Sequence, residues 1–138
     1  MKILIADDEL NNRKMLRAYL KSFGQCDMVS DGKEALELFI SDLEDGDPYD
    51  LVLLDIIMPN MDGQKTLSKM RAAEKRIAPD ARPTPIMMIT GMDSSVQAMQ
   101  AYFKGGCTDY LTKPVTRELL LEKLRKLNLI TDEESEGE

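Results

Sequence analysis

Residues 51–59 read LVLLDIIMP, an apolar run interrupted by a single acid. Four consecutive large apolar residues are typical of a strand buried on both faces of a parallel sheet. An ionised carboxylate at the tip of such a strand is costly unless a cation or hydrogen-bond donors compensate its charge. Asp55 is therefore the first candidate for a functional residue.

Other apolar runs of the chain also lead into polar residues. These residues are Asp7 and Asp8 after 2–6, Thr90 and Gly91 after 85–89, and Lys113 after 110–111. If the runs are parallel strands, their carboxyl ends meet at one edge of a sheet, where open α/β sheets place their functional sites. The acids, the hydroxyl and the ammonium would then lie together with Asp55.

The overall pattern predicts one α/β domain. Five short apolar runs, the weakest at 27–29, alternate with five segments of helical periodicity, as in a doubly wound parallel sheet. Right-handed crossovers would place helices on both faces. The expected helices are 10–23, 32–44, 63–75, 93–104 with Asp93 as its cap, and one from about Thr116. The domain is expected to span residues 1–128, followed by a disordered acidic tail at 129–138.

Composition excludes several classes of function. Residues 132–138 hold five of the 25 acids and no base, so the remainder has 20 acids against 18 bases and a charge of −2 out of −7. Without a basic stripe interleaved with aromatic residues, direct nucleic-acid binding is not expected. The chain has no histidine, which excludes Ser-His and Cys-His catalysis and histidine metal sites.

Location is predicted from two further features. No apolar run approaches membrane-spanning length, so no membrane association is expected. The two cysteines, Cys26 and Cys107, are expected to be reduced thiols. A cytoplasmic protein is the interpretation that accounts for both.

The polar groups have ordinary interpretations when each is taken alone. Asp7 or Asp8 could cap a helix, and Lys113 could be a solvated loop residue. Together, however, three carboxylates at neighbouring strand ends repel one another unless a divalent cation lies between them, and Mg²⁺ suits such oxygen ligands. A nearby ammonium, a hydroxyl and a free N–H suit phosphoryl oxygens. The combination predicts phosphoryl transfer to Asp55, and the chain has no GxxxxGK[ST] loop for a nucleotide.

The chain resembles the receiver domain of two-component response regulators, as found in single-domain chemotaxis regulators. The motifs that carry the resemblance over residues 1–128 are Asp7-Asp8, DIIMPNMDG at 55–63, Thr90-Gly91 and Lys113-Pro114. The resemblance implies a flavodoxin-like (βα)5 fold with a five-stranded parallel sheet of order 2-1-3-4-5.

The resemblance also implies functional roles. Asp55 would accept a phosphoryl group from a histidine kinase or a histidine phosphotransfer protein. The implied ligands of Mg²⁺, for which Mn²⁺ could substitute, are Asp8, Asp55, the main-chain carbonyl of Ile57 and, through water, Asp7. The implied phosphate-binding residues are Thr90, Gly91 and Lys113, and the implied switch residues are Thr90 and Tyr110. Output would be contact with a downstream protein, by a monomer or a phosphorylation-dependent dimer.

Two alternatives remain open at this point. The first is an Mg²⁺-dependent phosphatase with an aspartyl nucleophile, which usually has a second acid two residues later, where this chain has Ile57. The second is a receiver that binds partners without phosphorylation, against which the complete set of site residues argues. Because Ile57 and Met92 are apolar at places where receivers often have polar side chains, we expect a long-lived phosphoryl state.

Overall fold

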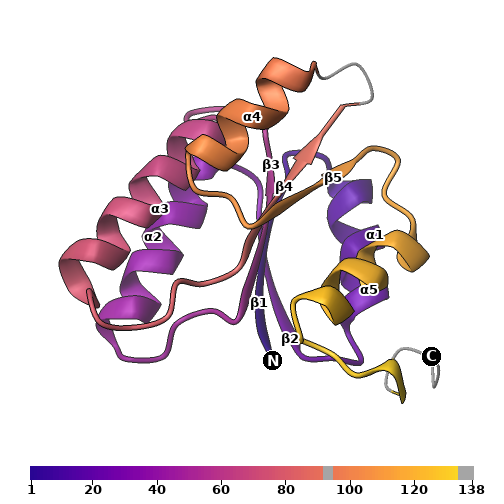
Figure 1. The fold of residues 1–138 in the computed structure, drawn as a ribbon, viewed down its shortest axis with the longest axis horizontal. Coiled ribbons are helices and arrows are strands. Elements are labelled where there is room, and N and C mark those ends of the chain that lie inside the picture. The colour runs from indigo at the N-terminus through magenta and orange to yellow at the C-terminus, as the bar shows by residue number, and fades with distance from the viewer. Residues whose placement is uncertain (92–94, 134–138) are drawn as a thin grey trace.

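The computed structural model describes residues 1–91 and 95–133. Within these residues, five parallel strands form one sheet of order β2-β1-β3-β4-β5, which confirms the predicted order (Figure 1). The strands are β1 (Lys2–Ala6), β2 (Gln25–Val29), β3 (Leu51–Asp55), β4 (Ile86–Thr90) and β5 (Asp109–Thr112). The helices are α1 (Leu10–Leu20), α2 (Gly32–Glu44), α3 (Gly63–Ile77), α4 (Val96–Lys104) and α5 (Arg117–Lys126).

The helices cover both faces of the sheet, as right-handed crossovers require. In Figure 1, α1 and α5 lie on one side, and α2, α3 and α4 lie on the other. Strand β3 contributes to both sides because successive side chains of a strand point to opposite faces. Leu51 and Leu53 pack with α1 and α5, whereas Val52 and Leu54 pack on the side of α2 and α3. All four are fully buried, as the unbroken apolar run predicts.

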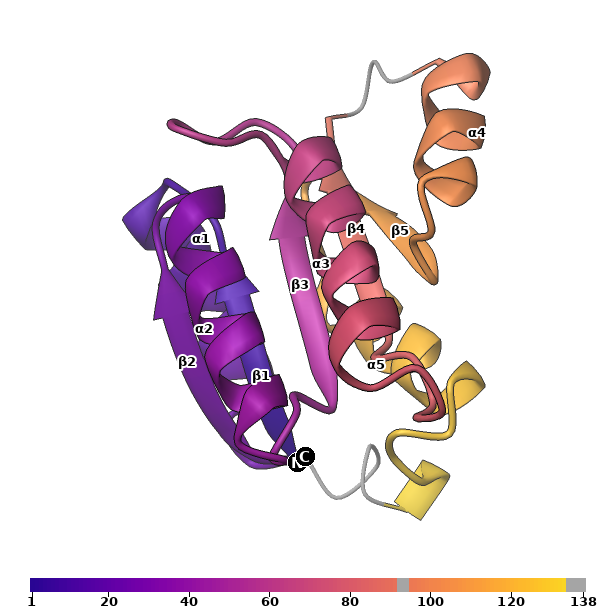
Figure 2. The same cartoon turned by 90° about the vertical axis from the view of Figure 1, so that its left-hand side faces the viewer.

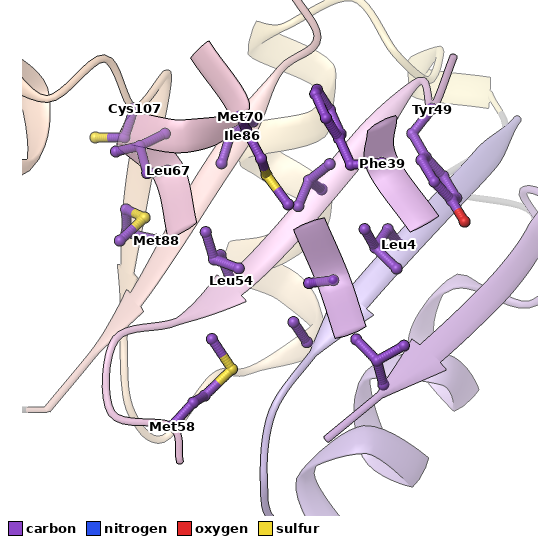
Figure 3. Close-up of a cluster of buried hydrophobic side chains, with 14 of the residues drawn as sticks. Leu4, Phe39, Tyr49, Leu54, Met58, Leu67, Met70, Ile86, Met88 and Cys107 are labelled. Atoms are coloured by element: carbon purple, nitrogen blue, oxygen red, sulfur yellow. The ribbon is translucent and has the colours of Figure 1, made fainter. Parts of the chain in front are cut away.

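The core between the sheet and helices α2 and α3 combines aliphatic and aromatic side chains with several methionines. Figure 3 shows Leu4 and Leu54 of the sheet beneath Phe39 of α2 and Met70 of α3. This core holds α3 against the sheet. It therefore also constrains the loop that connects Asp55, at the end of β3, to the start of α3. Figure 2 shows this loop at the carboxyl end of β3.

Several boundaries differ from the sequence-based expectations. Helix α4 begins at Val96, where the Ser95 hydroxyl accepts a hydrogen bond from the N–H of Ala98 at 3.0 Å; the expected cap, Asp93, lies outside the described residues. Helix α1 ends at Leu20 instead of residue 23. Beyond it, Gly24 lies so close to Met1 that a side chain there would overlap the Met1 carbonyl oxygen.

The packed part of the chain extends beyond the boundary expected at residue 128. Ile130 is 5% exposed and belongs to the apolar cluster beneath α1 and α5. Ile130 is therefore packed with the domain and does not belong to a solvated tail. Residues 134–138 lie outside the described part of the chain.

The two cysteines are free thiols. Cys107 is buried, and burial raises the pKa of its thiol to about 11. Burial also raises the pKa of the partly buried Cys26. Both are therefore protonated near neutral pH, as expected of inert structural thiols. Among the described helices, none is long and apolar enough to cross a membrane.

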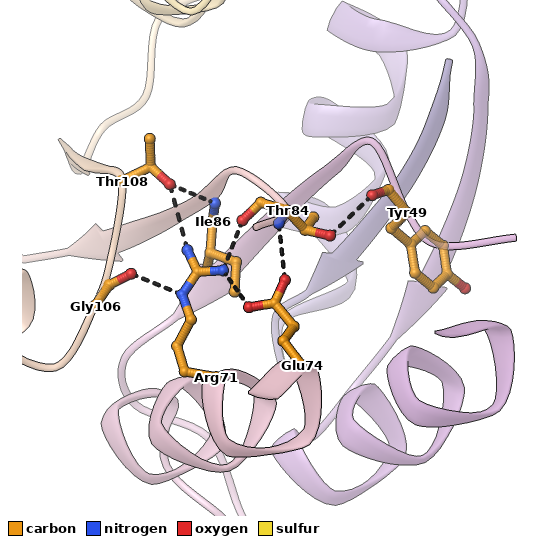
Figure 4. Close-up of polar contacts among 7 residues, drawn as sticks. All are labelled: Tyr49, Arg71, Glu74, Thr84, Ile86, Gly106 and Thr108. Carbon is orange, nitrogen blue, oxygen red and sulfur yellow. Dashed lines mark hydrogen bonds and ion pairs between the residues drawn. The ribbon is translucent and has the colours of Figure 1, made fainter. Parts of the chain in front are cut away.

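A polar network connects α3 to the amino end of β4 (Figure 4). The Arg71 guanidinium donates to the carbonyl oxygens of Thr84 and Gly106, each at 2.8 Å, and to Glu74 at 2.7 Å. The Glu74 carboxylate in turn accepts the N–H of Thr84 at 2.8 Å. One arginine thus joins α3, the loop before β4 and the loop before β5.

Candidate functional site

The carboxyl edge of the sheet brings the three predicted acids together. One carboxylate oxygen from each of Asp7, Asp8 and Asp55 lies within 4.8 Å of the others. Asp7 and Asp55 are 1% and 3% exposed, whereas Asp8 is open to solvent. Two buried carboxylates and one exposed carboxylate at this spacing form a site that a hard cation could enter from solvent.

Asp55 is paired with the predicted lysine. The Lys113 ammonium donates to Asp55 Oδ2 at 3.0 Å. The main chain of Lys113 is fixed by its N–H, which donates to the carbonyl oxygen of Thr90 at 2.7 Å. Partial burial lowers the pKa of Lys113, but the hydrogen bond and charge of Asp55 outweigh this, so the pKa is raised and the ammonium stays charged. The second carboxylate oxygen, Asp55 Oδ1, accepts the N–H of Ile57 at 3.3 Å.

Asp7 has one satisfied and one unsatisfied oxygen. Its Oδ1 accepts the N–H of Glu9 at 2.9 Å, whereas its buried Oδ2 has no hydrogen-bond partner among the described residues. Burial raises the pKa of Asp7 to about 6; the Glu9 hydrogen bond opposes this rise and the Asp55 charge adds to it. A buried oxygen without a partner among the described residues, beside two further carboxylates, fits a divalent cation, whose positive charge would lower the pKa of Asp7 again.

A small cavity of about 160 Å³ adjoins Asp55 on the side of β4. Its lining includes Thr90, Gly91 and Lys113, the three predicted phosphate-binding residues, together with Ile57. It also includes Tyr102 of α4. Tyr102 is 5% exposed, and its position in a helical segment gives no sequence signal that it lines the site.

Tyr110, the predicted switch residue, lies on β5, three residues before Lys113. Its ring meets that of Phe103 edge to face, with centroids 5.8 Å apart, and the Lys123 ammonium lies 5.2 Å from its centroid. Tyr110 thus contacts both α4 and α5. Phe103 is 45% exposed, so this aromatic pair is accessible from solvent.

The raised pKa of Asp7 predicts the pH dependence of stability in the absence of metal. The folded state retains the Asp7 proton up to about pH 6, whereas the pKa of an aspartate free in water is 3.8. The free energy of unfolding should therefore fall by about 2–3 kcal/mol as pH rises through this window. We expect Asp7→Asn to remove this contribution and to unfold at higher urea concentration than wild type at pH 7.5 in EDTA.

Urea unfolding of both proteins in EDTA between pH 4.5 and 7.5 measures this contribution. The difference between the two free energies isolates Asp7, because other titrating groups are common to both proteins. A difference that stays constant across the pH range would contradict the prediction.

Comparison with known proteins agrees with this geometry. The response regulator receiver domain family matches residues 3–125. The response regulator MprA of Mycolicibacterium vanbaalenii is 34% identical over 128 residues, which are 92% of this chain and 50% of the relative. The chain spans about half the length of the curated relatives it matches.

Solved structures show the same similarity. The chemotaxis protein CheY4 of Vibrio cholerae has a TM-score of 0.74 at 28% identity, covering 91% of this chain and 96% of its own. The receiver domain of the histidine kinase CKI1 from Arabidopsis thaliana, complexed with Mg²⁺ and BeF₃⁻, has a TM-score of 0.77 at 28% identity. It covers 91% of this chain and 88% of its own. The chain therefore belongs to the family of response regulator receiver domains, the signalling domains of two-component systems.

Proposed function

We propose that Asp55 accepts a phosphoryl group from a phosphohistidine of a histidine kinase or a histidine phosphotransfer protein, in an Mg²⁺-dependent reaction. The observation that carries this proposal is the position of Asp55. It is a buried carboxylate at a strand end, with an ammonium on one oxygen and two further acids within 4.8 Å. The carboxylates could bind the metal ion, and the Lys113 ammonium could bind a phosphoryl oxygen.

In this reaction a carboxylate oxygen of Asp55 attacks phosphorus, the O–P bond forms, and the P–N bond of the donor breaks. The donor imidazole keeps the electron pair of that bond and takes up a proton. Because the transition state is loose, positioning and charge compensation do most of the work. Lys113, Thr90 and Gly91 line the cavity beside Asp55 and would bind the equatorial oxygens.

Asp8, Asp55 and the main-chain carbonyl of Ile57 would hold the metal, with Asp7 acting through water. When bound, Mg²⁺ supplies positive charge that offsets the acids and the incoming phosphoryl oxygens. The buried Oδ2 of Asp7, which finds no hydrogen-bond partner in the part of the chain that the structure describes, supports this assignment. Mg²⁺ in the CKI1 receiver complex supports it by similarity.

Signal output would follow from a rearrangement of Thr90 and Tyr110. Thr90 lines the cavity that the phosphoryl group would enter, and Tyr110 contacts both α4 and α5. Movement of Thr90 toward the phosphoryl oxygens would give Tyr110 room to turn inward. The face formed by α4, β5 and α5 would then change shape and contact a downstream protein.

Labelling by acetyl phosphate tests the proposed reaction without a cognate kinase. With Mg²⁺, intact-mass spectrometry should show wild type taking up a single phosphoryl group, and EDTA should prevent uptake. Lys113→Ala should slow uptake about a hundredfold, because one positioned donor to the developing charge is lost. Lys75→Ala, at an exposed lysine of α3, should label as wild type. Uptake at the wild-type rate in EDTA would contradict the metal dependence.

The phosphoryl group is expected to be long-lived. Ile57, two residues after the acceptor, is 79% exposed and offers no polar group to position an attacking water. Met92, the second apolar position, lies outside the described residues. We expect Ile57→Glu and Met92→Glu to lose the phosphoryl group faster than wild type after acetyl phosphate is removed. Decay that is unchanged or slower in both variants would contradict this expectation.

A phosphatase remains the less favoured reading of the same residues. Such an enzyme would need a general acid near the position that Ile57 occupies. We expect no multiple turnover of a generic phosphate ester such as p-nitrophenyl phosphate. If wild type released p-nitrophenol over many turnovers and Asp55→Asn did not, the phosphatase interpretation would be supported instead.

A further inference from the structure

The loop between β3 and α3 is fastened to a distant part of the chain on the side away from the cavity. The side-chain amide of Asn60 donates to Asp31 Oδ2 at 2.9 Å, across 29 residues of sequence. In Figure 2 this loop passes over the end of α2 at which that helix begins. Neither Asn60 nor Asp31 takes part in the proposed reaction.

Asn60 has the backbone conformation that this contact requires. Its φ is 66°, in the left-handed region that asparagine enters more readily than most residues. The loop closes on itself on either side of Asn60. The N–H of Met61 donates to the carbonyl oxygen of Pro59 at 2.7 Å, and that of Gly63 to Ile56 at 2.8 Å. The loop is therefore compact, and the side-chain amide of Asn60 ties it to Asp31.

Asp31 is a fixed anchor. Its Oδ1 accepts the N–H of Glu34 at 2.8 Å and so caps α2. The Glu34 hydrogen bond, aided by the Asn60 amide, keeps the pKa of Asp31 below its usual value. The carboxylate that holds Asn60 is thus ionised and positioned by the helix that it caps.

Two glycines show how closely the three segments approach one another. A Cβ atom at Gly32, the first residue of α2, would overlap the carbonyl oxygen of Met61 and the Thr66 hydroxyl. A Cβ atom at Gly63 would overlap the carbonyl oxygen of Asp55. The first residue of α2 thus lies close against Met61 of the loop, and Gly63 lies close against the backbone of Asp55.

We propose that the hydrogen bond between Asn60 and Asp31 positions the β3–α3 loop for metal binding, so that both are positioning residues of the site. The loop carries Ile57, whose main-chain carbonyl is a proposed metal ligand and whose N–H contacts Asp55 at 3.3 Å. This inference rests on the proposed function. Loss of a group that holds a metal ligand in place commonly weakens metal affinity by about 10- to 100-fold.

Asn60→Gly tests the inference, because glycine keeps the left-handed backbone and loses only the amide. Asn128→Gly is the matched control, since Asn128 is the other described non-glycine residue with positive φ, at 59°. Isothermal titration calorimetry should give an Mg²⁺ Kd about tenfold weaker for Asn60→Gly and unchanged for Asn128→Gly. Without metal, hydrogen exchange of the Met61 and Gly63 amides should accelerate in Asn60→Gly alone.

A charge-conserving exchange separates this hydrogen bond from a general loss of stability. Asn60→Asp places two carboxylates against each other and should lose the amide protection. Combining it with Asp31→Asn restores a donor and an acceptor, retains a residue that caps helices well, and keeps the net charge. The double variant should regain the wild-type Mg²⁺ Kd and amide protection.

Wild-type Mg²⁺ affinity in Asn60→Gly, or no recovery in the double variant, would overturn the inference. These failures differ from a failure of the proposed function. If wild type itself bound no Mg²⁺, the metal site would be wrong and with it the positioning role, whereas amide exchange would still report whether the hydrogen bond orders the loop.

Discussion

Asp55→Asn is expected to take up no detectable phosphoryl group from acetyl phosphate in Mg²⁺, whereas wild type is labelled. An amide oxygen is a poor nucleophile. The variant also loses the negative charge of the carboxylate, to which the Lys113 ammonium donates at 3.0 Å. The fold should persist, because asparagine fits the same space at the end of β3. Intact-mass spectrometry of both proteins after the same incubation measures the effect.

Asp62→Asn is the matched control for this substitution. Asp62 is exposed and caps α3 by accepting the N–H of Lys65 at 2.9 Å, a role that asparagine can also fill. It should be labelled as wild type. Equal labelling of Asp55→Asn and wild type would mean that another residue is the acceptor.

Arg71→Ala is expected to lower the free energy of unfolding by about 3–5 kcal/mol. Arg71 and Glu74 are 2.7 Å apart with side chains only 16% and 12% exposed. Removing the guanidinium leaves the Glu74 carboxylate without its cation and the carbonyl oxygens of Thr84 and Gly106 without this donor. Urea unfolding monitored by circular dichroism measures the loss.

Arg76→Ala is the control for Arg71→Ala, because Arg76 is exposed on the same helix and should change stability by less than about 0.5 kcal/mol. Arg71→Ala combined with Glu74→Gln should recover part of the loss, since no unpaired charge remains. If Arg71→Ala lowered the free energy of unfolding by less than about 1 kcal/mol, the prediction would be wrong, because water would then satisfy the groups that Arg71 had bound.

Local patterns were sufficient for most of the fold. The apolar run that ends at Asp55 predicts a central strand because burial on both faces leaves no place for a polar side chain, and all of β3 is buried. Boundaries were less accurate. Ser95 caps the described α4, whereas the expected cap, Asp93, lies outside the described residues. Ile130 packs beyond the expected boundary, since an apolar side chain near a helix end can be buried or exposed.

The site was predictable to the extent that it follows from topology. Asp7, Asp8, Asp55 and Lys113 come together because parallel strands align their carboxyl ends. Side-chain pairs between distant segments leave no such pattern in the sequence. The hydrogen bond between Asn60 and Asp31, the Arg71 network and the approach of Tyr102 to the site emerged only from the packed structure.

The identity of the phosphorylated residue is the most direct test of the central claim. Borohydride reduces an aspartyl phosphate to homoserine, which marks the acceptor permanently in the peptide. After acetyl phosphate, Mg²⁺ and borohydride, peptide mass spectrometry of wild type should find homoserine at position 55 and intact aspartate at Asp7 and Asp8. Homoserine at Asp8 with intact Asp55, or a phosphoryl group on a serine or threonine, would contradict the account.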